Sequence, residues 1–403
     1  MWGDQPLRAV IIGNGVAGIW TASMLAGSPD VKVMVLTEED YLYYNKPHLL
    51  EYIAGRIEFE KVFVYPEEWY VKRGIDMRLG ERALAIDPVR KEVTLKGGKA
   101  AYDKLLLSTG GEPILPPIKG VDKKGVFTLR TARDAKSIRV YARGARRAVV
   151  VGGGLLGLEV AGALCSLGLG VTVVEFQRRL LPKQIDEQAS QLLMSMIEKM
   201  GIRVVVGGEV DAMHGEGRLE RIALKDGTGL EADLSVISVG IRARVELAAS
   251  SSLRVGRGIV VDGRMQTSAP DIYACGDVTE IEGKIGGIIP VALDQSKVAA
   301  LNILGGSATY GGTPHPLTLR VRGVKLASIG DVNATGGDYE ERKVVDADRG
   351  IYKKVVLKNG LLVGAILLGD TSKLRTIQEL ISRRRDLSEI KDAPLERDFG
   401  ELI

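Results

Sequence analysis

Two glycine-rich segments of this chain carry the residue spacing that binds the pyrophosphate of a dinucleotide. RAVIIGNGVAG begins at Arg8 and RAVVVGGGLLG begins at Arg147, and both run from apolar residues into the pattern G-x-G-x-x-G. The first glycine permits a tight turn, the second lets a pyrophosphate approach the backbone, and the third lets helix and strand pack closely. The N–H groups at the start of the following helix then face the phosphates. The pattern glycines are Gly13, Gly15 and Gly18 in the first copy and Gly152, Gly154 and Gly157 in the second, 139 positions later.

Each copy is followed by an apolar run that ends in an acid. VKVMVLTEE ends in Glu38 and Glu39, and VTVVE ends in Glu175. An acid about 20 residues after the glycines accepts a hydrogen bond from a ribose 2′-OH. The repeat therefore predicts two dinucleotides bound at once. Because a carboxylate repels a 2′-phosphate, Glu175 favours NADH, whereas Arg178 and Arg179, which follow closely, are the alternative and favour NADPH.

The elements around the motifs predict an α/β protein. The all-apolar run from Ala9 to Ile12 is typical of a strand buried on both faces of a parallel sheet. A length of 403 residues predicts two or three domains, and 50 glycines suit layers joined by glycine turns. We expect two Rossmann-like, doubly wound domains and a C-terminal α+β domain, which begins with strand-rich sequence and ends in a helix over residues 371–385.

Composition excludes several functional classes. Net charge is only +4, so the sequence predicts no nucleic-acid partner. The longest apolar segments, such as LLVGAILL at Leu361, are too short to span a bilayer, which predicts no transmembrane segment. MWGDQPLR resembles no signal peptide, so we expect a cytoplasmic protein. With five Asn and eight Gln among many charged residues, the composition also hints at a thermophilic source.

Neither cysteines nor histidines form a reactive pattern. Cys165 and Cys275 belong to no C-x-x-C pair and are interpreted as small core residues. The three histidines, at positions 48, 214 and 315, are scattered without ligand spacing, so no metal site is predicted.

The order of the remaining motifs resembles a known family. YLYYNKPHLL follows the first acids, DKLLLSTGGEP begins at Asp103, and APDIYACGDV begins at Ala269. From residue 7 to about residue 370 this order is similar to that of the two-dinucleotide-binding flavoproteins, the pyridine nucleotide-disulfide oxidoreductase superfamily, and especially to the NADH-dependent rubredoxin and ferredoxin reductases. In that family the first unit binds FAD and the inserted second unit binds NAD(P)H.

The resemblance assigns roles in an FAD site. Asp277 of the G-D turn would accept a hydrogen bond from the ribityl chain, and the Thr109–Gly110 turn would close over the cofactor. Lys46, which precedes Pro47, would place a cation near the flavin or its phosphates, unless it is an exposed loop lysine. Arg130 would reach FAD, unless it is a solvated arginine at a helix start. The further implied contacts are Ala17 at the pyrophosphate, Glu38 or Glu39 at the adenosine ribose, Ala83 at the adenine and Val291 near the pyrimidine edge of the flavin.

The resemblance also assigns an NADH site and the domain boundaries. Glu159, among apolar neighbours on the second helix, would lie beside the nicotinamide and pair with a lysine, for which Lys46 is the candidate; a structural role is the alternative. Leu155, Leu156 and Gly240 would line the same site. Residues 1–112 and 243–313 would form the FAD domain, residues 113–242 the inserted NAD(P)H domain, and residues 314–403 a C-terminal domain of the kind that often makes homodimer contacts.

The stretch EEDYLYYNKPH contains no cysteine, and this distinguishes among the activities known in the family. Disulfide reductases need a cysteine pair in that stretch, and coenzyme A disulfide reductases and water-forming NADH oxidases need one cysteine. The reduced flavin is therefore expected to pass electrons to an external acceptor, foremost a rubredoxin- or ferredoxin-type protein. Arg383, Arg384 and Arg385 are a candidate docking site for it, or solvated charges at a helix end. The alternatives are a subunit of a larger dehydrogenase or electron-transfer complex, an NADH oxidase that forms hydrogen peroxide, and a slow redox sensor.

Overall fold

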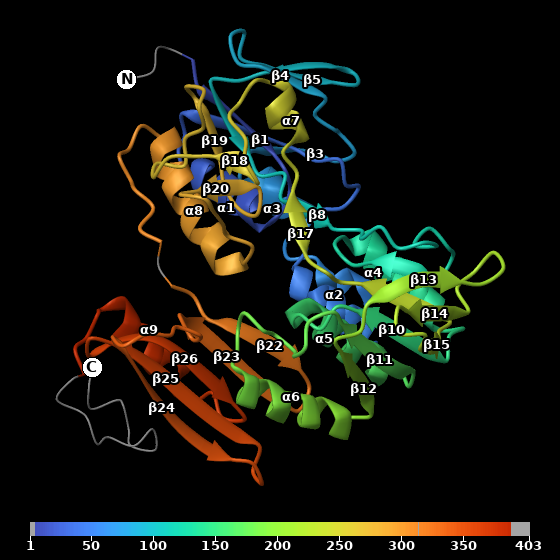
Figure 1. Cartoon of the computed structure of the whole chain (residues 1–403). Helices are drawn as coiled ribbons and strands as arrows, with labels where there is room; N and C mark the ends of the chain where they lie inside the picture. Colours follow the sequence, from blue (N-terminus) through green and yellow to red (C-terminus); the bar gives the residue numbers. More distant parts are fainter. Residues whose placement is uncertain (1–4, 313, 388–403) are drawn as a thin grey trace. The chain divides into compact units, whose positions relative to one another are not determined.

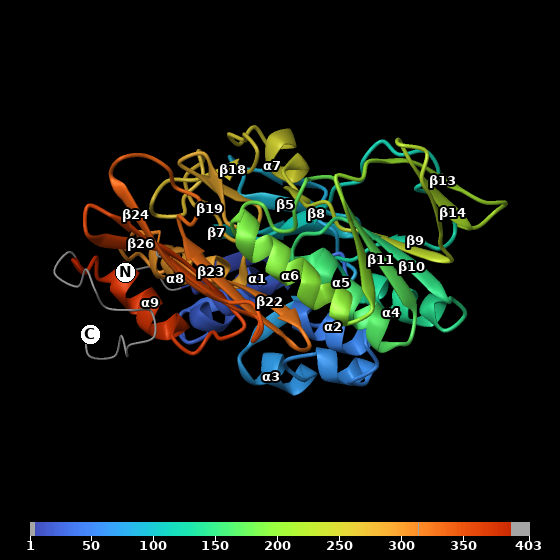
Figure 2. The same cartoon turned by 60° about the horizontal axis from the view of Figure 1, so that its bottom comes forward.

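The computed structural model describes residues 5–312 and 314–387 (Figures 1 and 2). The chain divides into two compact units. Unit 1 contains residues 1–49, 58–113 and 241–312, and unit 2 contains residues 50–57, 114–240 and 313–403. The described part of residues 314–387 thus clusters with residues 114–240, and the division into three domains stays a prediction.

Unit 1 is built on a five-stranded parallel sheet in the order β19-β7-β1-β2-β3. Its central strand β1 is buried along Ala9–Ile12, as its apolar sequence predicts, because helices cover a parallel sheet on both faces. Helices α1 and α8 pack side by side (Figure 1). These core elements are β1 (Leu7–Ile12), α1 (Val16–Leu25), β2 (Val31–Leu36), β3 (Ile75–Arg78), β7 (Lys104–Leu107), β19 (Ile272–Ala274) and α8 (Ile289–Ile303).

Smaller elements complete unit 1. A three-stranded antiparallel sheet, β4-β5-β6, lies between β3 and β7 in the sequence, and β8 pairs with β17 where the chain leaves and re-enters the unit. The bounds are α2 (Lys46–Ile53, which contains the boundary between the units), η1 (Phe59–Val62), α3 (Glu67–Lys72), β4 (Ala85–Asp87), β5 (Glu92–Leu95), β6 (Gly98–Ala101), β8 (Gly111–Pro113), β17 (Ile241–Ala243), α7 (Glu246–Ser250), β18 (Ile259–Val260), β20 (Thr279–Ile281) and β21 (Lys284–Ile285).

Unit 2 repeats this architecture. Its parallel sheet has the order β12-β11-β10-β16-β9, so β10 takes the place of β1, β11 that of β2 and β16 that of β7. An antiparallel sheet, β13-β14-β15, again precedes the returning strand. The bounds are β9 (Val126–Thr128), α4 (Ala132–Ala142), β10 (Arg147–Val151), α5 (Leu155–Ser166), β11 (Gly170–Glu175), α6 (Glu187–Lys199), β12 (Ile202–Val206), β13 (Val210–His214), β14 (Arg221–Leu224), β15 (Gly229–Glu231) and β16 (Leu234–Ile237).

The C-terminal part of unit 2 is an antiparallel sheet in the order β22-β23-β26-β25-β24. Helix α9 packs against β23 and β26 through Ile377, Leu380 and Ile381, while α5 contacts β22, and α6 runs beside the sheet (Figure 2). The helix ends at Ser382, earlier than the sequence predicts, because Arg384 has a left-handed backbone (φ 51°). The bounds are β22 (Leu317–Val321), β23 (Val324–Gly330), β24 (Tyr339–Asp346), β25 (Ile351–Lys358), β26 (Leu361–Leu368) and α9 (Leu374–Ser382).

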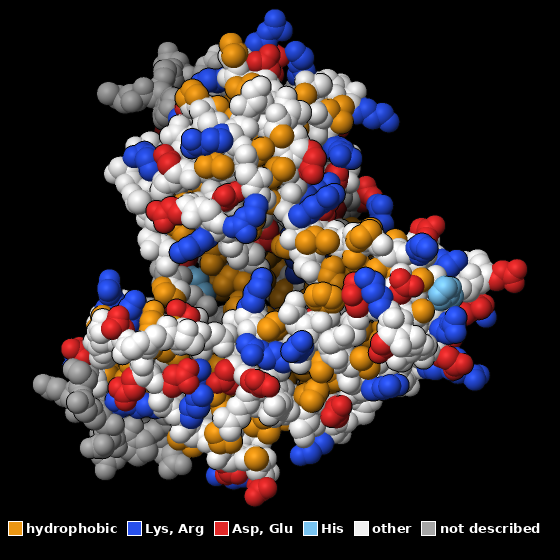
Figure 3. Space-filling model, in the orientation of Figure 1, with side chains coloured by type: hydrophobic (Ala, Val, Ile, Leu, Met, Phe, Trp, Pro, Cys, Tyr) orange, Lys and Arg blue, Asp and Glu red, His pale blue; other side chains and the backbone are white. Residues whose placement is uncertain are grey.

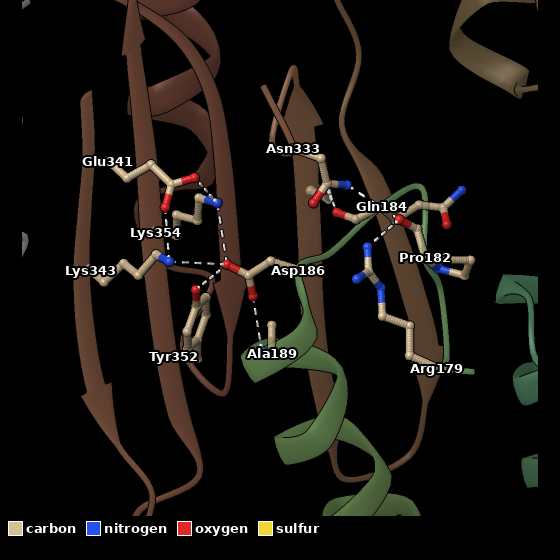
Figure 4. A network of polar contacts seen from close by, with 11 residues as sticks. Arg179, Pro182, Gln184, Asp186, Ala189, Asn333, Glu341, Lys343, Tyr352 and Lys354 are labelled. Atoms are coloured by element: carbon tan, nitrogen blue, oxygen red, sulfur yellow. Dashed lines mark hydrogen bonds and ion pairs between the residues drawn. The ribbon is translucent and has the colours of Figure 1, made fainter. Parts of the chain in front are cut away.

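A polar network around the buried Lys354 joins α6 to this sheet (Figure 4). Lys354 is only 2% exposed, and its Nζ lies 2.6 Å from Glu341 Oε1 and 3.3 Å from Asp186 Oδ2. Asp186 caps α6 by accepting from the N–H of Ala189, and it accepts from the Tyr352 hydroxyl at 2.5 Å. Burial raises the pKa of Asp186, but these hydrogen bonds and the charge of Lys354 outweigh burial and hold the pKa below its ordinary value.

Replacing Lys354 by Met is expected to destabilise the protein at neutral pH by about 1.5–3 kcal/mol, because it removes the buried cation that Asp186 and Glu341 share and, among the described residues, leaves them only Lys343. The pKa of Glu341, like that of Asp186, is lowered by its partners despite burial. The stabilisation from both groups is therefore present above the unfolded pKa of about 4 and is lost as pH falls through the folded pKa.

Thermal denaturation at a series of pH values measures this effect. The difference in Tm between the wild type and Lys354→Met should narrow on acidification. Lys358→Met, on the exposed end of the same strand, is the control and should change Tm little. This account is contradicted if the Tm of Lys354→Met equals that of the wild type at pH 7, or if the difference in Tm stays constant down to pH 2.

Candidate cofactor-binding sites

The first glycine turn has the geometry that its pattern predicts. Gly13 has φ 117°, and a Cβ there would overlap the carbonyl oxygen of Ser108 at the end of β7. A Cβ on Gly18 would overlap the carbonyl oxygen of Gly13. Beyond Gly15 lies open space, so a ligand has access to the backbone there. The three glycines are thus required for a tight turn, an open approach and close helix packing, in the order expected from the sequence.

The start of α1 is equipped to hold phosphate. Gly15 is its N-cap residue and supplies no side-chain cap, so the first N–H groups of the helix are left for another acceptor. Asn14 Nδ2 donates to Tyr41 O at 2.8 Å, but its buried Oδ1 has no hydrogen-bond partner. A dinucleotide offers phosphate oxygens as acceptors for these N–H groups and hydroxyl groups as donors to Asn14 Oδ1. The residues present therefore fit FAD.

The two acids after β2 already have protein partners. Glu38 Oε1 accepts from Arg244 Nη1 at 2.5 Å and its Oε2 lies 3.6 Å from Arg82 Nε, while Glu39 Oε2 accepts from the Tyr44 hydroxyl at 2.8 Å. The hydrogen bond from Arg244 lowers the pKa of Glu38. Arg244 is a residue that the sequence reasoning missed, because 206 positions separate it from Glu38.

The acids of the two copies are not at equivalent positions. Gly13 N donates to Leu36 O, and Gly152 N donates to Val174 O. By this register Thr37 is the counterpart of Glu175, and Glu38 comes one residue later. The chain from Gly13 to Leu36 is one residue longer than that from Gly152 to Val174, which the matching glycine numbers conceal.

Several residues assigned to FAD lie in unit 1 near the ends of its strands. Asp277 is half-buried and follows Gly276, whose φ is 86°. Thr109 Oγ1 donates to Arg244 O at 3.0 Å, and Arg244 N donates to Gly110 O at the same distance, so the predicted T-G turn is tied to the returning chain. Ala17 is buried in the first turn of α1, Val291 is half-buried in the first turn of α8, and Ala83 packs on the edge of the core.

Four further candidates are divided between the units. Lys46 and Pro47 are half-buried at the start of α2 in unit 1. Arg130 belongs to unit 2, where it precedes Thr131, the N-cap of α4, and its N–H donates to Asp134 Oδ2 at 2.9 Å. Glu159 also belongs to unit 2. The pairing of Lys46 with Glu159 and the contact of Arg130 with FAD stay predictions.

The second glycine turn, in unit 2, repeats the first. Gly152 has φ 115° and faces the carbonyl oxygen of Ser238, the counterpart of Ser108, while a Cβ on Gly157 would overlap Gly152 O. The space beyond Gly154, the N-cap of α5, is open. Leu155 and Leu156 form the first turn of that helix, and Gly240 (φ 117°) follows β16.

Glu175 is held in place beside this turn. Its Oε2 accepts from Gly153 N at 2.6 Å and its Oε1 from Gln177 N at 2.7 Å. The adjacent Phe176 is 62% exposed, an unusual position for an aromatic ring, and was not among the predicted residues. Arg178 is exposed, whereas Arg179 is half-buried and donates to Pro182 O at 3.0 Å (Figure 4). Of the two arginines, Arg179 is thus already engaged by backbone.

Glu159 has a structural partner. Its Oε1 accepts from the backbone N–H of Arg320, on edge strand β22, at 2.8 Å. Burial raises the pKa of Glu159, and the hydrogen bond offsets only part of that shift. This contact supports the structural alternative, and it leaves the second carboxylate oxygen with capacity for a ligand donor.

The cysteines lie in different units and in different surroundings. Cys275 is fully buried in unit 1, and burial raises the pKa of its thiol to about 11. Cys165 is half-buried in unit 2, with its sulfur 3.6 Å from Met200 O. A thiol with a raised pKa is a poor nucleophile at neutral pH, so Cys275 is not suited to thiol chemistry.

Comparison with known proteins identifies the family. Residues 7–297 match the family described as pyridine nucleotide-disulphide oxidoreductase, and residues 316–385 match the rubredoxin NAD+ reductase C-terminal domain. The chain is 34% identical to the nitrite reductase [NAD(P)H] of Bacillus subtilis, over 98% of this chain and 50% of that protein. It is 29% identical to the NADH-rubredoxin oxidoreductase of Clostridium acetobutylicum, over 95% of this chain and 96% of that protein. The crystal structure titled NADH:rubredoxin oxidoreductase from Clostridium acetobutylicum superposes with a TM-score of 0.80 at 28% identity, covering 97% of this chain and 98% of that one.

The chain therefore belongs to the pyridine nucleotide-disulphide oxidoreductase family. The predicted family and the α/β fold class are confirmed. The chain spans about half the length of the curated relatives at the head of the comparison, the nitrite and nitrate reductase components. Across residues 5–312 and 314–387, no helix is both long enough and apolar enough to cross a membrane.

Glu175→Ala is expected to weaken NADH binding about tenfold or more, because a hydrogen bond to a charged acceptor is worth about 1.5–3 kcal/mol. Its effect on NADPH should be smaller, since the repulsion of the 2′-phosphate also disappears. The rate of flavin reduction, followed by stopped-flow absorbance with each nucleotide, measures the preference.

Glu175→Gln separates charge from anchoring. Its side-chain oxygen can still accept from Gly153 N, so we expect this variant to keep more NADH affinity than Glu175→Ala. Because the negative charge is lost, the difference in affinity between NADH and NADPH should become smaller. A wild-type protein that prefers NADPH would show instead that Arg178 or Arg179 determines the choice.

Proposed function

We propose that this protein takes electrons from NADH and passes them, through FAD and without a redox-active cysteine, to a rubredoxin- or ferredoxin-type protein. The main support is the pair of matching glycine turns, one in each unit, each with an uncapped helix start and an acid after the second strand. When bound, FAD would supply the conversion of a two-electron hydride donor into a source of single electrons.

The chain's own residues would bind and orient the two cofactors. In unit 1 the start of α1 would hold the FAD pyrophosphate, and Asp277 would accept from a hydroxyl of the flavin's sugar chain. In unit 2 the start of α5 would hold the NADH pyrophosphate, and Glu175, already fixed by two backbone N–H groups, would accept from the ribose hydroxyls. Positioning and electrostatics are the contribution that a protein makes to hydride transfer.

The acceptor is inferred from two observations. The stretch from Glu38 to His48 contains no cysteine, so an internal disulfide cannot take the electrons. The C-terminal region matches a domain of rubredoxin reductases, and the relative from Clostridium acetobutylicum is an NADH-rubredoxin oxidoreductase. We propose Arg383, Arg384 and Arg385, which are exposed after α9, as docking charges, and the C-terminal sheet as a homodimer surface.

A second candidate function is suggested by the longer relatives. The nitrite reductase of Bacillus subtilis matches nearly the whole of this chain with only half of its own length. In that case the protein would deliver electrons to a larger reductase as one of its components. Copurification of a stable partner would favour this function over that of a free reductase.

The purified protein should be yellow and hold about one FAD per chain without a covalent bond. Asp277→Ala should lower the FAD content sharply because it removes an acceptor for the cofactor's hydroxyls. Asp271→Asn is the matched control, since Asp271 precedes the same strand β19 and pairs with Lys91 and Lys104. Flavin absorbance per chain is the measurement, and an unchanged content in Asp277→Ala removes Asp277 from the site.

Docking through the arginines predicts a response to salt. Reduction of an acidic acceptor protein should slow as salt rises, because the screening length is already about 8 Å at physiological ionic strength and shortens above it. Reversing the charge of Arg383, Arg384 and Arg385 should abolish this dependence. Reduction of a small uncharged dye is the control and should follow neither change. Equal salt responses for protein and dye, or unaltered protein reduction after charge reversal, would contradict docking at these residues.

Charge on the surface does not by itself identify a docking face. In Figure 3, Lys and Arg side chains are interspersed with Asp and Glu, which agrees with the net charge of only +4. The arginine triplet is therefore proposed for its local density and its place in the C-terminal domain.

A further inference from the structure

The Gly276–Asp277 turn needs support from outside its own strand. It follows the three-residue strand β19, and Gly276 has φ 86°, a conformation that costs little only for glycine. A Cβ on Gly276 would lie 3.0 Å from the Cβ of Ala17, so the turn sits directly on the first turn of α1. The direction of the following Asp277 depends on how the peptide groups of Gly276 are held.

Gln295 on α8 holds that turn. Its side chain is only 1% exposed, and its Oε1 accepts from Gly276 N at 2.8 Å. The Thr279 hydroxyl lies 3.1 Å from the same oxygen and 2.8 Å from Gly276 O, and it donates to one of the two at a time. Both the N–H and the C=O of Gly276 are thereby fixed by buried side chains.

The same cluster reaches the phosphate-binding end of α1. Ser296 Oγ, fully buried, lies 3.1 Å from Ala17 O and 2.5 Å from Ala292 O. Thr21 Oγ1 donates to Ala17 O at 2.9 Å, and the Cys275 sulfur lies 3.7 Å from Ser296 Oγ. The Gly276 turn and α8, which are close in sequence, are thus joined by uncharged groups to α1, which lies far away in sequence, at the place where the sequence predicts the pyrophosphate and the sugar chain of FAD.

We propose that Gln295 is a positioning residue of the FAD site, which orients Asp277 relative to the start of α1. This inference rests on the proposed function and deepens it. A neutral amide suits the task, because it supplies a strong acceptor in a buried place without the cost of burying a charge. Hydrogen bonds that hold a binding group in one orientation raise affinity by reducing what must be ordered on binding.

The test compares FAD affinity with stability. Gln295→Leu keeps the apolar bulk and removes the acceptor, so FAD should bind the apoprotein of the full chain at least about tenfold more weakly in a fluorescence titration. The matched control is Asn302→Leu. Asn302 lies two turns further along α8, is 2% exposed, and holds a different loop through Arg264 O and Ala308 O. Both variants should lower the Tm of the apoprotein, but only Gln295→Leu should weaken FAD binding.

Two milder variants keep a side-chain oxygen acceptor at position 295. Gln295→Glu retains an oxygen at the same reach and should recover part of the affinity lost in Gln295→Leu, although burying a carboxyl group should lower the Tm of the apoprotein further. Gln295→Asn withdraws the oxygen by one methylene and should weaken FAD binding at least about threefold, which provides a measurement if Gln295→Leu does not fold.

The outcomes distinguish the two proposals. A wild-type apoprotein that does not bind FAD overturns the proposed function. A wild type that binds FAD, together with unchanged affinity in the Gln295 variants or an equal loss in Asn302→Leu, overturns only the role of Gln295.

Discussion

The closest backbone contact in both dinucleotide turns is the constraint on which the rest of the structure depends. In each copy the third glycine of the pattern, which lies in the helix, packs against the carbonyl oxygen of the first glycine. That first glycine packs against the carbonyl oxygen of the serine that follows the neighbouring strand. No side chain can be inserted at these contacts. Helix, turn and two strands are thereby held at one separation, which points the uncapped helix start at the place where a pyrophosphate must lie.

Residue types and spacing predicted the parts of the sites that depend on local geometry. The glycine turns, the strands that precede them and the position of Glu175 follow from short-range rules, and the structure places them accordingly. The mismatch between Glu175 and Glu38 escaped prediction because the first copy has one residue more between its first glycine and the residue of the second strand that accepts from it, which shifts the register without altering any motif. The early end of helix α9 was also not predicted, because the left-handed backbone at Arg384 is not marked by a glycine or a proline in the sequence.

Long-range partners could not be predicted from one sequence. Arg244 contacts Glu38 across 206 positions, and Ser296 contacts Ala17 across 279. Gln295 looks like an ordinary helical residue, and only the fold shows that it is buried against a turn. Lys354 likewise reads as one of many charged strand residues, although its ammonium group is enclosed between Asp186 and Glu341. Such residues carry no local pattern, because the partner that gives them a role lies in another element.

The discontinuity of unit 1 has a consequence for the order in which the chain folds during synthesis. Strand β7 is an interior strand of the finished sheet, yet its neighbour β19 emerges from the ribosome about 165 residues later, after the whole of residues 114–240. Until then β7 is the edge strand of an incomplete sheet, and an exposed edge strand can pair with other chains. The inserted Rossmann unit has all five of its strands by Ile237 and can fold first. Newly made protein is thus expected to complete the proposed nicotinamide-nucleotide site before the proposed flavin site, with a period of aggregation risk between the two.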